Sequence, residues 1–116
     1  MLFRAATLAL LLLLSCAHGT AWAQAGANAD PNEQLVVQAR YWETRGRYDL
    51  ARETWLKLLR ADPDSASALS GLAYSEARSN RPAAAQVYLD RLREASPDHP
   101  EIRRIEGAIR LSLIHI

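Results

Sequence analysis

The sequence contains a single cysteine, Cys16, and no large excess of charge of either sign, since 14 lysines and arginines stand against 13 aspartates and glutamates. One cysteine cannot form a disulfide within the chain. A nucleic-acid-binding protein normally shows a clustered excess of basic residues. We therefore expect no internal disulfide and no nucleic-acid partner.

Histidines are few as well, and His18, His99 and His115 lie far apart in the sequence. Scattered histidines without cysteine partners do not form a metal site. The 5 glycines form no phosphate-binding loop, and no serine stands in the context of a nucleophile elbow. We predict a non-catalytic protein without metal or cofactor, because an enzyme would need catalytic residues that lie outside this sequence.

A long apolar run occurs only near the N-terminus. Residues 1–23 combine Arg4, the run AATLALLLLL and the triplet Ala21-Trp22-Ala23, which is the pattern of a secretory signal peptide. The run is shorter than the roughly 20 apolar residues that span a bilayer. We expect cleavage after Ala23 and export to the periplasm, with association to the outer membrane as a further expectation.

Cys16 supports an alternative to that cleavage. It follows Leu13 and Ser15 as in a lipoprotein signal, and acylation there would tether the protein to a membrane.

Removal of residues 1–23 takes away one basic and no acidic residue, so 13 of each remain. Both alternatives leave a chain without net formal charge.

The rest of the sequence is organised by a repeat. Residues 24–32, QAGANADPN, have no apolar periodicity and indicate a flexible linker. Pro63 and Pro97 then lie 34 residues apart within similar segments, LLRADPDSASAL and LREASPDHPEI. A period of 34 is typical of helix–turn–helix repeats. We assign residues 33–64 and 65–98 to two units and residues 99–111 to the first helix of a third.

Apolar spacing predicts helices over residues 31–44, 49–61 and 65–79, and from 82 and 101 onward. Gly46 and Asn80 are expected to end two of them in a left-handed conformation. Gly107 and Ala108 are expected to allow a close approach of the fifth helix. The fold class is therefore all-α, with antiparallel helix–turn–helix repeats. Its predicted core consists of Leu35, Ala39, Trp42, Ala51, Trp55, Leu58, Leu69, Leu72, Ala73, Ala85, Leu89 and Leu92.

These residues resemble the tetratricopeptide repeat. Gly46, Tyr48 and Pro63 join the core residues on the family's positions, whereas Gln38 and Glu76 depart from them at a leucine and an aromatic position. The resemblance implies a stack of helix pairs that binds other proteins through a groove lined by the first helix of each unit. The groove candidates that it implies are Val36, Arg40, Glu43, Ser70, Tyr74 and Arg78, with Glu33, Thr44, Ser67 and Ala77 at equivalent positions.

The chemistry of these candidates narrows the expected ligand. Arg40, Tyr74 and Arg78 are of types in which binding energy concentrates, although each position is also compatible with an ordinary solvated helix face. The lysines and asparagines of the family's peptide-carboxylate clamp are absent from these positions. We expect Trp42, Tyr48 and Trp55 to pack in the core rather than to stack on a ligand.

A narrower resemblance covers the leader, the linker and the segment EQLVVQARYWETRGRYDLARETWLKLLRADPDSASALSGLAYSEA. It is similar to the start of the cellulose synthase operon protein C family, which joins a periplasmic repeat scaffold to an outer-membrane export channel. The resemblance implies a scaffold with cell-envelope or polysaccharide-synthase proteins as partners. The alternative is a general envelope-assembly factor, lipid-anchored if Cys16 is acylated.

The end of the sequence, RLSLIHI, lacks the polar cap that usually closes a repeat domain. Residues 111–116 resemble a translated sequencing adapter, so residues 112–116 are expected to be an artefactual tail on a piece of a longer protein. The third unit then has one helix without its partner. We expect self-association through that helix.

Overall fold

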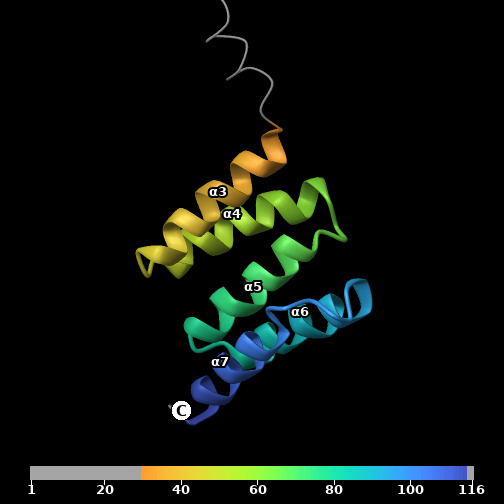
Figure 1. Cartoon of the computed structure of the whole chain (residues 1–116). Helices are drawn as coiled ribbons and strands as arrows, with labels where there is room; N and C mark the ends of the chain where they lie inside the picture. The colour runs from red at the N-terminus through yellow and green to blue at the C-terminus, as the bar shows by residue number, and fades with distance from the viewer. Residues whose placement is uncertain (1–29, 115–116) are drawn as a thin grey trace, which may run out of the picture. The chain divides into compact units, whose positions relative to one another are not determined.

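The computed structural model describes residues 30–114, which form α-helices and turns without a strand (Figure 1). This confirms the predicted all-α class. The expected signal peptide, Cys16, most of the linker and residues 115–116 lie outside the described residues. The helices are α3 (Pro31–Thr44), α4 (Tyr48–Ala61), α5 (Ala66–Arg78), α6 (Pro82–Ala95) and α7 (Ile102–Ile114).

Turns of three residues connect α3 to α4 and α5 to α6, and each turn contains one left-handed residue. Gly46 has φ of 70° and Asn80 has φ of 60°, as predicted. In both turns, the amide of the next residue donates to the carbonyl five positions back, at 2.9 Å. Glycine and asparagine tolerate this conformation better than other residues do. The same backbone solution is therefore repeated 34 residues later.

The connection from α4 to α5 comprises residues 62–65 and contains Pro63, the first of the two prolines that mark the repeat. Asp62, which precedes Pro63, is extended, as steric contact with a following proline requires. The Ser65 hydroxyl oxygen accepts a hydrogen bond from the Ala68 amide at 3.2 Å and caps α5. The helix expected over residues 65–79 thus has a serine as the cap at each end.

The connection from α6 to α7 comprises residues 96–101, so it is two residues longer than the connection from α4 to α5. It contains a second proline, Pro100, and the His99 ring nitrogen Nδ1 accepts a hydrogen bond from the Glu101 amide at 3.2 Å. The helix α7 therefore begins later than a strict repeat of 34 would place it. It also continues to Ile114, past residue 111 where the third unit was expected to end.

The later start of α7 relative to α5 is visible in the first backbone hydrogen bond of each helix. The Leu69 amide donates to the Ser65 carbonyl at 3.0 Å, and the equivalent bond joins Ile105 to Glu101, also at 3.0 Å. Ile105 follows Leu69 by 36 residues. Residues of α7 therefore match residues of α5 at an offset of 36, whereas α6 matches α4 at 34.

Two buried clusters hold the helices together, and α5 contributes to both. We call the packing of α5 on α3 and α4 the first junction, and the packing of α7 on α5 and α6 the second junction. Nine of the 13 residues of α5 are buried, and α5 contacts each of the other four helices between residues 30 and 114. Ten of the twelve predicted core residues are buried, while Leu35 and Trp42 are half-buried against the first cluster.

Glu76 is a buried acidic residue in α5, with 2% of its surface exposed. Its carboxylate pairs with Arg52, and at 3.8 Å with Arg81. A buried charge is tolerated when it is paired in this way. This explains how an acidic side chain can occupy a position where the repeat family carries an aromatic residue.

Candidate functional site

The groove residues predicted on α3 are occupied by internal contacts. Arg40 pairs with Glu43 at 3.0 Å and lies 5.0 Å from the ring centroid of Trp55. The Glu43 carboxylate also accepts a hydrogen bond from the indole nitrogen of Trp55 at 2.9 Å. Val36 is half-buried against the same cluster. These side chains hold the indole in place instead of forming an open surface.

Ser70 does not reach the groove surface, because only 2% of it is exposed. Its hydroxyl donates to the Ser67 carbonyl at 3.0 Å, one turn earlier on α5. Helical spacing places it on the correct side of α5, but the neighbouring helices cover it. Tyr74 and Arg78, the other two candidates on α5, are partly or fully exposed.

Tyr74 and Arg78 belong to an arginine–tyrosine cluster that also contains Tyr48 and Arg104. The two tyrosine rings meet edge to face, with centroids 6.0 Å apart. The Arg78 guanidinium lies 5.3 Å from the Tyr48 ring and 6.0 Å from the Tyr74 ring. Arg104 lies 3.9 Å from the Tyr74 ring. Cation–π contacts of this kind order arginines at a surface.

The cluster affects the ionisation of Tyr48. Burial raises the pKa of the Tyr48 hydroxyl above its ordinary value, and the neighbouring Tyr74 raises it further while Arg78 opposes the shift. The hydroxyl is therefore neutral at physiological pH and can donate a hydrogen bond. Beside it, a hydrogen bond from Arg47 lowers the pKa of Asp49, and the same bond raises the pKa of Arg47.

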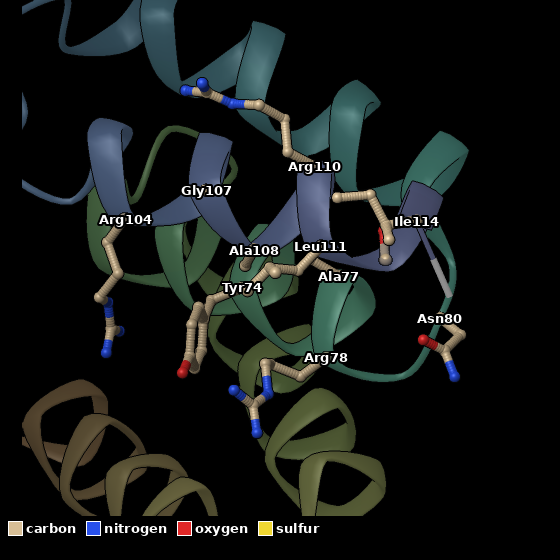
Figure 2. Close-up of a pocket in the computed structure, with 11 residues that line it drawn as sticks. Tyr74, Ala77, Arg78, Asn80, Arg104, Gly107, Ala108, Arg110, Leu111 and Ile114 are labelled. Carbon is tan, nitrogen blue, oxygen red and sulfur yellow. The ribbon is translucent and has the colours of Figure 1, made fainter. Parts of the chain in front are cut away.

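A pocket of about 800 Å³ lies between α5 and α7 and includes part of this cluster (Figure 2). We call it the α5–α7 pocket. Figure 2 shows Arg104 at one end, and Asn80 and Ile114 at the other. Its lining combines small and aliphatic residues with arginines and contains no acidic residue. The lining residues are Tyr74, Ala77, Arg78, Asn80, Arg104, Gly107, Ala108, Arg110, Leu111, Ser112 and Ile114.

Two glycines in equivalent positions, Gly71 and Gly107, have different surroundings. A Cβ atom on Gly71 would lie 2.1 Å from Cε2 of Trp55, so the indole needs glycine there. A Cβ atom on Gly107 would have no atom within 4 Å. The predicted close approach is therefore wrong at Gly107, since the α5–α7 pocket lies beside it, whereas Ala108 is buried in the second cluster where α7 packs on α5.

Sequence reasoning misses three of the residues that matter here. Tyr48 is expected in the core from its repeat position, but it is half-buried and its ring contacts Arg78. Gly71 has no predicted role, yet a glycine inside a helix often indicates a packing reason. Arg104 is missed because a fixed period of 34 misaligns α7. The pair Ile105 and Ile109, at 36 from two buried residues of α5, could have revealed the shift.

Comparison with known proteins places this architecture in a family. A family model described as "Tetratricopeptide repeat" matches residues 44–109. The chain is a tetratricopeptide repeat protein. The face that carries Tyr74 and Arg78 belongs to the first helices of successive tetratricopeptide units, the helices that the resemblance predicted to line a groove.

The relatives of this tetratricopeptide repeat chain confirm the narrower resemblance. It is 42% identical over 85 residues to cellulose synthase operon protein C of Xanthomonas axonopodis pv. citri (strain 306), and the match covers 73% of this chain and 6% of that protein. It is 36% identical over 107 residues to the protein of the same name from Pseudomonas fluorescens (strain SBW25), and that match covers 92% of this chain and 8% of that protein. The chain thus spans less than a tenth of either relative.

A solved structure is similar as well. It is the crystal structure of the flexible tandem repeat domain of a bacterial cellulose synthase component, with a TM-score of 0.63 and 28% identity. The match covers 73% of this chain and 39% of that chain. Among residues 30–114, no helix has both the length and the apolar character needed to cross a membrane.

Proposed function

We propose that this tetratricopeptide repeat chain is a non-catalytic scaffold that binds protein components of cellulose synthesis and export in the periplasm. The similarity to two cellulose synthase operon proteins C carries the proposal. The arginine–tyrosine cluster supports it, because arginine and tyrosine are enriched among residues that dominate protein interfaces. The leader-like residues 1–23 support export.

Deletion of the codons for residues 31–114 in the source bacterium tests the scaffold role. We expect cellulose, measured as acid-insoluble glucose, to fall several-fold. Unchanged cellulose would contradict the proposal. Unchanged cellulose together with a detergent-sensitive envelope would support the envelope-assembly alternative instead.

Photo-crosslinking tests the partner class. A photoreactive amino acid in place of Arg78 is expected to capture a cellulose-synthesis protein in living cells. The same amino acid in place of Lys57, an exposed residue on α4, is the matched control. Equal capture from both positions would argue against the assigned face.

Alkaline phosphatase fused after residue 116 tests the compartment, since the enzyme is active only after export. A fusion without residues 1–23 is the control. Equal phosphatase activity from both fusions would contradict export through this segment.

A further inference from the structure

The α5–α7 pocket lies where the first junction holds an indole. Gly71 and Gly107 are equivalent at the 36-residue offset of α5 and α7. Trp55 on α4 covers Gly71, and Leu89 on α6 is the residue 34 positions after Trp55. Leu89 is shorter and is buried in the second cluster, and no atom lies within 4 Å of the Cβ position of Gly107.

The residues of α5 that line the pocket also correspond to residues that surround the indole at the first junction. At the first junction, Arg40 lies over the indole and Glu43 accepts its N–H. The residues 34 positions later are Tyr74 and Ala77, and both line the pocket. The pocket is thus bordered by the equivalents of three residues that contact the indole at the first junction, with alanine in place of the larger glutamate.

The charge of the pocket adds a second requirement for a ligand. Three arginines line it, with no acidic residue among the lining side chains. Arg104 pairs with Glu101 at 2.6 Å, and Arg110 approaches Glu106 at 4.0 Å. Arg78 makes no ion pair with any residue between 30 and 114, and its described contacts are with two tyrosine rings. It is the cation that is available to a carboxylate.

We propose that the α5–α7 pocket binds a partner peptide through a tryptophan or other large aromatic side chain flanked by aspartate or glutamate. The aromatic ring lies on Gly107 as the indole of Trp55 lies on Gly71, and a flanking carboxylate pairs with Arg78. Apolar contact with Ala77 and Ala108, which also line the pocket, adds to the binding. This inference rests on the proposed scaffold function and names the chemistry of its partner.

Fluorescence anisotropy with a labelled peptide tests the proposal on the full chain. The probe is a short peptide with one tryptophan between two pairs of aspartates. We expect saturable binding that weakens at least tenfold when the tryptophan is changed to alanine, and at least tenfold when the aspartates are changed to asparagines. Binding that needs the aspartates but not the tryptophan would overturn the aromatic part of the proposal.

Three chain variants locate the site. Gly107→Leu places a side chain in the pocket, and Arg78→Glu reverses the available charge. Both are expected to weaken binding at least tenfold, with helicity by circular dichroism unchanged. Arg60→Glu is the matched control, because Arg60 and Arg78 are both exposed arginines in the last turn of a helix. It is expected to change binding less than twofold.

Absence of saturable binding, or binding that survives both Gly107→Leu and Arg78→Glu, would overturn the proposal. If Gly107→Leu fails to fold, the peptide affinity of the surface variant Arg78→Glu still tests the proposal. The cellulose assay remains separate: lost cellulose in the deletion strain with no peptide binding overturns the pocket alone. Normal cellulose with peptide binding overturns the scaffold function and leaves the pocket as a peptide site.

Discussion

At the first junction, α5 packs against α4 far more extensively than it packs against α3. At the second junction, α7 packs against α5 and α6 to similar extents. A buried indole occupies the first junction, and aliphatic side chains with an open pocket occupy the second. The turns within the two units, at Gly46 and Asn80, are otherwise alike. A difference of one large side chain and a longer connection therefore separates a closed core from a surface that can accept another side chain.

Removal of the Trp55 indole tests whether that side chain accounts for the difference between the two junctions. Trp55→Ala is expected to lower the free energy of unfolding by about 4 kcal/mol, as for other buried tryptophans. Leu89→Ala at the second junction should cost about 3 kcal/mol. Urea unfolding followed by circular dichroism measures both. A larger cost for Leu89→Ala would contradict the greater role assigned to the indole.

The two glycines provide a sharper test, because alanine should have opposite effects at them. Gly71→Ala pushes a methyl group into the indole and is expected to destabilise the fold by about 2 kcal/mol. Gly107→Ala has open space and improves helix propensity, so it should stabilise by about 0.5–1 kcal/mol. Urea midpoints of the two variants that shift in the same direction would refute the contrast.

The turns of the two units allow a smaller test. Gly46→Ala is expected to cost about 1 kcal/mol, because alanine is disfavoured at φ of 70°. Asn80→Gly should stabilise by only a few tenths of a kcal/mol, since asparagine already tolerates the conformation. Thermal unfolding measures both changes. Stabilisation by Gly46→Ala would mean that the turn can relax to a right-handed conformation.

The smallest expected effect concerns Tyr48. Burial raises its pKa in the folded state, so the folded chain holds this proton more tightly than the unfolded chain does. The resulting stability is complete below the ordinary tyrosine pKa of about 10 and is lost as pH rises above it. Urea midpoints at increasing alkaline pH should fall less steeply in Tyr48→Phe. Tyr41→Phe, at an exposed tyrosine, is the control and should behave as the unchanged chain.

The repeat was predictable because strong local signals mark it. The prolines and the apolar spacing predicted the helices within about one residue of their observed bounds. The left-handed conformations of Gly46 and Asn80 followed from residue type. The register of α7 was not predictable from the period of 34. Two residues added in a turn leave every local signal intact and change only which face of the next helix is buried.

Only part of the candidate site was predictable, because helical spacing fixes the face on which a residue lies but not what covers that face. Tyr74 and Arg78 could be named because helical spacing places them on one face of α5. Spacing does not say which neighbour covers a face, so Ser70 was expected at the surface although α5 is largely enclosed. Similarly, a pocket depends on what a side chain from another helix leaves empty, and this is decided by tertiary packing.

The helix α5 has a consequence for how the chain opens. It contacts the four other helices of the described part of the chain, and Leu59 and Tyr88 pack against both buried clusters. Separation of α5 from its neighbours would expose both clusters at once, so its amides should exchange with solvent deuterium only through unfolding of the whole helical unit. Amides near the ends of α3 and α7 can exchange through local fraying. Protection against exchange should therefore decrease from the middle of the unit toward both ends.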